Sequence, residues 1–438
     1  MAERFVDAAL SNADGSHEAT FFLGDQFVTY NYDRDRVNDG VHPVSDLGFP
    51  AGFTPSGVGA SLDAALKGRK QFTDTGYCFR GTNYGRLALD VRAGDPNLGA
   101  LSAWGLPAPL DAGVEAAFNG RAPTRDGKGY FFRGSQYVRY DWAQDHPDPD
   151  FPKQIGTMVG MVAPFSLGID AAVDGEGAFA SFGYLFREDR YLRFAWDPAG
   201  GGEPRVDGAP ASIQGNWTGL AELLLAGAAK TQALAWTDAA MARLSAFLVA
   251  GSGGAPFPFD AAVFDAALAS HFHVDPGAAP SVRAAAVSQI LVTFSNVSTT
   301  LRQSATVFRY RTDAEATGVD GNPSVPDAYA FFGGTINVTG GFVSRGPLNR
   351  AASVLHESVH VVDDLGGSST THIPEWYVTD PVADSLGLSH QPDTADFATR
   401  YDLMPAADAQ HNPSSYAAFA QHVALGADTR FGAGRPDQ

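Results

Sequence analysis

Hydrophobic residues in the first half of the chain fall in short aromatic runs that repeat four times. Each run follows a five-residue opening of one apolar residue, one acid, two alanines and another apolar residue. Two aromatic segments then meet at a Gly or Asp turn, as in residues 129–140, and this pattern predicts a β-hairpin. The acids of the four openings lie 56, 52 and 55 residues apart, and a period of about 50 residues indicates a propeller or a similar array. These acids are Asp7, Asp63, Glu115 and Asp170.

The four units resemble hemopexin repeats, and the resemblance extends to about residue 222. It implies an all-β, four-bladed propeller over residues 1–222, with the Ala-Ala pairs on the innermost strands. In this family, main-chain carbonyls line a central channel that often holds a calcium or sodium ion. The resemblance would place the four acids around that axis, as residues of the ion site. A disulfide commonly joins the first and last blades of such propellers, but Cys78 is the only cysteine, so we expect closure by packing.

The second half of the chain has helical patterning. Residues 223–258 are expected to be a helical linker or the start of a second domain. Two further helices are predicted at about 259–272 and 279–303, and alternating residues predict a strand at 328–339.

The next predicted helix carries the most informative motif of the chain. Apolar residues from Leu348 to Val362 recur at helical spacing, and with Pro347 in the first turn they predict a helix over about 347–365. This helix contains His356-Glu357-Ser358-Val359-His360, the HExxH pattern of zinc hydrolases. Histidines four residues apart share one helix face, so both imidazoles can bind one zinc ion while Glu357 accepts a proton from water. The alternative is a pair of structural histidines.

A catalytic zinc ion needs a third protein ligand. Asp363 and Asp364 lie a further turn along the helix, beyond the reach of a short carboxylate. The ligand is therefore expected after Gly366 and Gly367, and the candidates are His372, Glu375 and Asp380.

Residues 260–425 are similar to the deuterolysin and peptidyl-lysine metalloendopeptidase family, the aspzincins. The similarity comprises the strand, the HExxH helix, an acidic-aromatic turn after it, and residues 412–420, which look like the Asn-Ala-Asp-Ser-Tyr helix of that family. The family's Gly-Thr-x-Asp-x-x-Tyr turn is missing. Glu375-Trp376 is the closest acidic-aromatic pair, so Glu375 is the preferred third ligand and His372 the alternative.

The same resemblance implies an α+β zincin-type metallopeptidase domain over residues 259–438. In zincins, the strand before the motif helix is an exposed edge on which a peptide substrate can pair. Tyr377 or Tyr416 is a candidate donor to the developing oxyanion. A core or surface tyrosine is the alternative role for each.

Composition and charge limit the kinds of molecule that the protein is expected to bind. The 438 residues carry a formal net charge of -19, which argues against nucleic acid or anionic lipid as a partner. No unbroken apolar run approaches the roughly 18 residues of a membrane span, so none is expected. The first residues lack a signal peptide pattern. We expect a protein that is secreted or delivered outside the cell by another route, with a cytoplasmic location as the alternative.

Together these patterns predict a multidomain zinc metalloendopeptidase that acts on proteins or peptides. Hemopexin-like propellers are mostly binding modules, so the propeller is expected to bind a target or ligand, with a rigid spacer as the alternative. The rival function is a non-catalytic hemopexin-type binding protein with a vestigial zincin domain.

Overall fold

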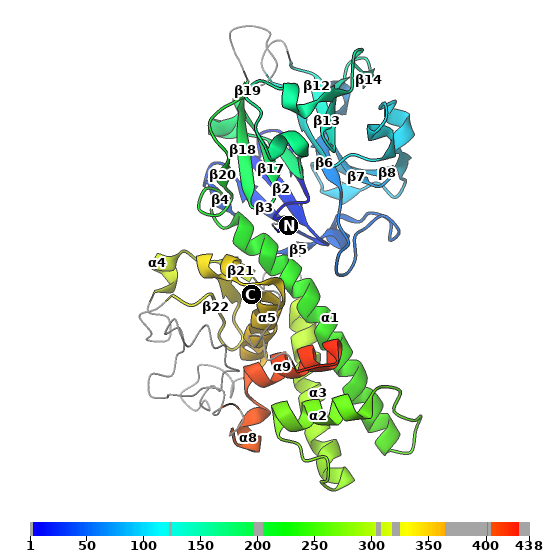
Figure 1. Cartoon of the computed structure of the whole chain (residues 1–438), viewed down its shortest axis with the longest axis vertical. Helices are drawn as coiled ribbons and strands as arrows, with labels where there is room; N and C mark the ends of the chain where they lie inside the picture. Colours follow the sequence, from blue (N-terminus) through cyan, green and yellow to red (C-terminus); the bar gives the residue numbers. More distant parts are fainter. Residues whose placement is uncertain are drawn as a thin grey trace. The chain divides into compact units, whose positions relative to one another are not determined.

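The computed structural model describes residues 3–121, 125–196, 205–303, 308–317, 325–363, 401 and 404–428. The chain divides into two compact units, Met1–Ala228 and Ala229–Gln438 (Figure 1). The boundary falls inside one long helix, α1 (Leu220–Gly251).

The N-terminal unit contains four five-stranded antiparallel sheets (Figure 1). In each sheet an inner strand pairs with the first strand of a hairpin, whose two strands have six residues each, and two short strands pair with the second strand of the hairpin. The first sheet comprises β1 (Ala8–Ser11), β2 (Glu18–Leu23), β3 (Gln26–Asn31), β4 (Arg36–Val37) and β5 (His42–Pro43), and the second comprises β6 (Ala64–Lys67), β7 (Thr75–Arg80), β8 (Asn83–Ala88), β9 (Ala93–Gly94) and β10 (Gly99–Ala100). The third sheet comprises β11 (Ala116–Asn119), β12 (Lys128–Arg133), β13 (Gln136–Asp141), β14 (His146–Pro147) and β15 (Lys153–Gln154). The fourth comprises β16 (Ala171–Asp174), β17 (Phe182–Arg187), β18 (Arg190–Ala195), β19 (Arg205–Val206) and β20 (Ala211–Ser212).

The inner strands of the four sheets surround a common axis. β1 contacts β6, β6 contacts β11, β11 contacts β16, and β16 contacts β1. The first alanine of each strand is buried and lies opposite a phenylalanine of the neighbouring hairpin strand. Small residues therefore face the crowded axis while aromatic rings fill the space between blades. This arrangement fits the predicted four-bladed hemopexin-like propeller.

The ring closes without a disulfide, as expected. The indole of Trp217 packs against Phe21 of the first blade and Phe186 of the fourth, with ring centroids 5.5 and 5.2 Å apart. The backbone N–H of Phe5 donates to the carbonyl of Glu188, which adds a main-chain contact between the same blades. Cys78 is a buried free thiol, and burial raises its pKa to about 12. Its contribution is therefore that of a small apolar core residue.

The described part of the C-terminal unit is mainly helical. Helix α9 packs on both α2 and α5, and α5 also contacts α3 and a small sheet. Its elements beyond α1 are α2 (Ala261–Phe272), α3 (Pro280–Arg302), β21 (Phe308–Tyr310), α4 (Asp313–Ala316), β22 (Ala328–Tyr329), β23 (Ile336–Val338), α5 (Pro347–Val362), α8 (Ala406–Ala409) and α9 (Pro413–Leu425).

The single strand predicted at 328–339 is wrong, because the segment forms two strands. β22 and β23 pair antiparallel, and Gly333 between them has a φ of 67°. The N–H of Gly333 donates to the carbonyl of Val361 in α5, at 2.8 Å. Only glycine adopts this conformation readily, so the Gly-Gly pair breaks the strand. Among the described strands, β23 lies between β21 and β22. The strand that directly precedes α5 is therefore central, and β22 is an edge strand of this sheet.

Helix α1 is an exception to the expectation that no segment could span a membrane. Among the described helices, α1 is long and apolar enough to cross a membrane, by its length and composition alone. The sequence expectation counted unbroken apolar runs, whereas α1 is apolar through many alanines. Glu222 and Lys230 are both buried within this helix. One helix of this kind is weak evidence for a span, because core helices of other proteins have the same composition.

Candidate functional site

The HExxH motif lies in the last two turns of α5. Ala351, Val354, Leu355 and Val359 are buried and anchor one side of this helix. The helix ends at Val362 rather than near residue 365, because Asp363 is extended, with φ -122° and ψ 111°.

The two motif histidines face each other with their Nε2 atoms 3.2 Å apart. Two ligand nitrogens at about 2.0–2.1 Å from a tetrahedral zinc ion lie roughly 3.3–3.4 Å apart. His356 and His360 therefore already hold the spacing of two zinc ligands. Both imidazoles are half-buried, so the site keeps access to solvent.

A hydroxyl from a different helix orients His356. Ser414, at the start of α9, places its Oγ 3.1 Å from Nδ1 of His356. A hydrogen bond to one imidazole nitrogen fixes the direction of the other, as it does for histidines that bind metals. Ser414 lies in the 412–420 segment that resembles the aspzincin helix, but no spacing in the sequence joins it to His356, which is 58 positions away.

Glu357 is buried, with 8% of its surface exposed. A buried carboxylate is unfavourable unless hydrogen bonds or a nearby positive charge compensate for lost hydration. Its position next to His356 on α5 therefore suits a general base beside a metal ion.

Asp363 has a different partner from the motif histidines. Its Oδ2 lies 2.8 Å from Nδ1 of His411, which precedes α9. This contact links the end of α5 to the α9 region. Four residues predicted near the zinc ion lie outside the described residues, namely His372, Glu375, Tyr377 and Asp380.

The structure favours a core role for Tyr416. Its hydroxyl donates to the carbonyl of Gln410 at 2.6 Å, and its ring packs against Phe272 and Phe294 with centroids 5.0 and 5.1 Å apart. Burial raises the pKa of Tyr416 far above its ordinary value, so the hydroxyl remains protonated. A role as oxyanion donor would require this hydroxyl to leave Gln410.

The four propeller acids share one structural contact that the sequence did not reveal. Each carboxylate accepts a hydrogen bond from a backbone N–H in the turn of its own blade's hairpin. The pairs are Asp7 with Gly24 at 2.8 Å, Asp63 with Gly81 at 2.5 Å, Glu115 with Gly134 at 2.7 Å and Asp170 with Glu188 at 2.7 Å. The acid of each repeat therefore ties the inner strand to the hairpin turn.

Two of these acids also share a cation. The guanidinium of Arg4 lies 3.5 Å from Oδ1 of Asp7 and 3.0 Å from Oδ1 of Asp170. Burial raises the pKa of Asp7, while the Gly24 and Arg4 contacts oppose that rise. A bound metal ion is therefore not needed to explain the charge at these positions.

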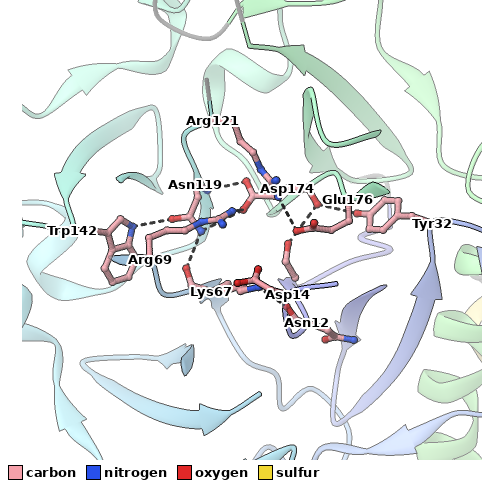
Figure 2. A network of polar contacts seen from close by, with 11 residues as sticks. Asn12, Asp14, Tyr32, Lys67, Arg69, Asn119, Arg121, Trp142, Asp174 and Glu176 are labelled. Atoms are coloured by element: carbon pink, nitrogen blue, oxygen red, sulfur yellow. Dashed lines mark hydrogen bonds and ion pairs between the residues drawn. The ribbon is translucent and has the colours of Figure 1, made fainter. Parts of the chain in front are cut away.

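A second polar network lies where the inner strands end (Figure 2). Lys67 is buried, and its Nζ donates to the carbonyl of Asn12 at 2.9 Å and to Oδ1 of Asp14 at 2.5 Å. Asp174 is also buried; its carboxylate accepts the backbone N–H of Asn119 at 3.0 Å and the guanidinium of Arg69 at 3.3 Å.

The remaining contacts join this network into one unit. Asn119 donates through Nδ2 to the carbonyl of Lys67 at 2.8 Å, and Trp142 donates through Nε1 to Oδ1 of Asn119 at 2.9 Å. Lys67 belongs to the second blade, and Asn119 and Trp142 belong to the third (Figure 2). Positive charge at this end of the inner strands comes from Lys67, Arg69 and Arg121, whose guanidinium lies 2.7 Å from the carboxylate of Glu176.

Comparison with known proteins gives limited matches. No family model matches the chain. Stromelysin-1 of Equus caballus is 28% identical over 158 residues, which are 36% of this chain and 28% of that relative. The chain thus spans less than a third of this relative's length. The aspzincin resemblance has no support from these comparisons.

Several solved structures resemble about half of the chain. A seed albumin from Lathyrus sativus is 21% identical with a TM-score of 0.43, covering 51% of this chain and 99% of that chain. A hemopexin fold protein from cow pea is 20% identical with a TM-score of 0.40, and the match covers 49% of this chain and 96% of that chain. A plant lectin with two metal binding sites from Cicer arietinum is 18% identical with a TM-score of 0.40, and the match covers 48% of this chain and 95% of that chain. By its own structure the chain is multidomain, with four antiparallel sheets that fit a hemopexin-like propeller in the N-terminal half and a mainly helical C-terminal half over the described residues.

Proposed function

We propose that this protein is a zinc-dependent metalloendopeptidase whose catalytic centre is the HExxH motif of α5. The observation that carries the proposal is the 3.2 Å separation of the Nε2 atoms of His356 and His360. The buried Glu357 between them and the Ser414 hydroxyl behind His356 add to it. The partial similarity to stromelysin-1, a metalloprotease, is compatible with this chemistry.

The two histidines of α5 fit zinc in type and spacing, and a third protein ligand would come from outside this helix. When bound, zinc lowers the pKa of a bound water toward about 7 and polarises the scissile carbonyl. His356 and His360 hold the ion, and Ser414 keeps His356 in the binding orientation. Glu357 accepts a proton from the attacking water and returns it to the nitrogen of the leaving amine. The substrate class is therefore proteins or peptides.

Glu375 is proposed as the third ligand, with His372 as the alternative. If Glu375 binds zinc, Glu375→Ala should weaken zinc binding far more than His372→Ala does. The opposite ranking would assign the ligand to His372. Tyr377 or Tyr416 is proposed as the oxyanion donor, and the contact of Tyr416 with Gln410 makes Tyr377 the first variant to measure.

The proposal extends to the domain organisation and the location of the protein. Residues 259–438 would form the zincin-type, aspzincin-like peptidase domain, and the propeller would bind the target or a ligand. A calcium or sodium ion would be held in the channel of the propeller by main-chain carbonyls of the inner strands. Secretion or other delivery outside the cell would bring the enzyme to its substrate.

A paired assay of zinc content and casein hydrolysis tests the catalytic proposal. His360→Ala should lower the zinc content by one ion per chain and abolish hydrolysis, because two ligands cannot hold the metal against a chelator. His146→Ala is the matched control, since His146 is exposed in the propeller and contacts the carbonyl of Pro147. Unchanged zinc content in His360→Ala would overturn the assignment.

A further inference from the structure

A second group of metal-ligating side chains lies in the C-terminal unit, away from the HExxH motif. The imidazoles of His271 and His422 and the carboxylate of Asp428 each offer one ligand atom, and these three atoms lie within 4.8 Å of one another. We propose that these residues bind a zinc ion that joins α2 to α9.

The geometry of the histidine pair repeats that of the motif. Nε2 of His271 lies 3.1 Å from Nδ1 of His422, close to the 3.2 Å that separates the two motif nitrogens. Both distances approach the roughly 3.3–3.4 Å edge of a zinc tetrahedron. His271 belongs to the last turn of α2 and His422 to the last turns of α9, so one ion would hold two helices together.

A carboxylate completes the group from the solvent side. Oδ1 of Asp428 lies 3.9 Å from Nε2 of His271, and its side chain is 25% exposed while that of His271 is fully buried. Gly426, with a φ of 76°, ends α9 just before Asp428. A carboxylate at this position can balance the charge of a cation that is held in a buried site.

The outer nitrogen of His271 has a partner that sets its orientation. The hydroxyl of Tyr401, which is buried, lies 3.1 Å from Nδ1 of His271. If Nδ1 carries the proton and donates to Tyr401, the lone pair of Nε2 points to the ion. Two imidazoles and a carboxylate form a ligand set suited to Zn²⁺, with a fourth position left for water.

The second site is separate from the motif on α5, but helix α9 contributes a residue to each of them. His422 follows Ser414 by eight residues in α9, which corresponds to about 12 Å along the helix axis. Ser414 contacts His356 of the motif. An ion at His271 and His422 would therefore fix the helix that orients a motif histidine, which is a structural role.

The test measures zinc in the full chain with the motif disabled. The double variant His356→Ala, His360→Ala should retain one zinc ion per chain after dialysis, and zinc should raise its thermal unfolding temperature. Adding Asp428→Asn should weaken zinc affinity by more than ~10-fold, because a charged ligand is lost. Asp428 is partly exposed, so this change should leave the fold intact.

Two further variants separate zinc bound at this site from zinc bound elsewhere in the chain. In the chain with an intact motif, Asp428→Asn alone should lower the zinc content from two ions to one. The control is His273→Asn, which alters the histidine two positions from His271 and keeps a residue that tolerates its φ of 53°. A folded double variant that binds no zinc would overturn the proposal and leave His271 and His422 as a hydrogen-bonded pair. Zinc binding that neither Asp428→Asn nor His422→Gln weakens would overturn it too, since the ion would then lie elsewhere.

Discussion

The two units of this protein use buried polar groups in different ways. In the propeller, Lys67 is held by Asp14 and by the carbonyl of Asn12, and the carboxylates of the repeats are held by backbone N–H groups. In the C-terminal unit, two pairs of imidazoles turn nitrogen toward nitrogen at 3.1 and 3.2 Å. The propeller network pairs the buried charges of Lys67 and Asp174 with oppositely charged protein groups and so stabilises a fold. Converging ligand nitrogens instead create a place for a cation.

The largest effect should come from Glu357→Gln, which changes the chemistry of the C-terminal unit without changing its shape. The amide cannot accept the proton, so casein hydrolysis should fall by ~10²–10⁴-fold or more, while zinc content and the circular dichroism spectrum stay unchanged. Asp313→Asn, an exposed acid of the same unit, is the control and should have full activity. Normal turnover in Glu357→Gln would show that this residue is not the general base.

Lys67→Met tests the claim that the propeller network is structural. The change leaves the carbonyl of Asn12 without this donor, and we expect a loss of ~1–3 kcal/mol in the free energy of unfolding of the propeller. Lys70→Met is a matched control, because Lys70 also contacts a carboxylate at 2.5 Å but is exposed, so it should cost ~0–1 kcal/mol. Equal losses in urea denaturation would contradict the distinction between buried and exposed lysines.

The same variant should alter the acid sensitivity of the propeller. The hydrogen bond from Lys67 lowers the pKa of Asp14 in the folded state. A lowered folded pKa contributes stability that is present above the unfolded pKa of about 3.9 and is lost as pH falls through the folded value. Lys67→Met should therefore reduce the loss of stability on acidification below about pH 4. An identical pH profile for both proteins would show that Asp14 does not depend on Lys67.

A smaller effect is expected when the contact between an acid and its hairpin turn is removed. Asp63→Ala leaves the N–H of Gly81 without its acceptor and should destabilise the propeller by ~1 kcal/mol. Asp63→Asn keeps an oxygen acceptor and should cost less. If the four acids were instead needed mainly to bind an ion, both variants would lose stability equally, and only in the presence of calcium or sodium.

The smallest effect concerns the turn of the fourth blade. Gly24, Gly81 and Gly134 adopt positive φ in the first three hairpins, whereas Glu188, with a φ of 56°, takes this position in the fourth. Glu188→Gly should relieve strain and stabilise the propeller by ~0.5 kcal/mol, measured by thermal unfolding. A loss of stability would mean that the Glu188 side chain contributes more than its backbone strain costs.

The sequence predicted the propeller because its information is periodic and local. The acid, the alanine pair and the aromatic hairpin recur at a fixed period, and the structure contains a sheet for each copy. The partner of each acid could not be predicted, because it lies 17 to 19 residues away across a hairpin. Lys67 and Asp174 were missed since they do not repeat from blade to blade.

The C-terminal unit was predictable only where its chemistry is local. The motif histidines share one helix and were found from their spacing, whereas His271 and His422 are 151 residues apart and have no sequence signal that joins them. The break at Gly333 could have been expected from the Gly-Gly pair. The third zinc ligand stays a prediction, because Glu375 and His372 lie outside the described residues.

Anomalous diffraction at the zinc absorption edge, on crystals of the full chain, tests the central claim most directly. The account predicts a peak between the Nε2 atoms of His356 and His360, with a third protein ligand from residues 364–400. The second proposed site would give its own peak at His271 and His422, so the two assignments are read separately. The absence of a peak between His356 and His360 in zinc-supplemented crystals would contradict the assignment of this protein as a zinc peptidase.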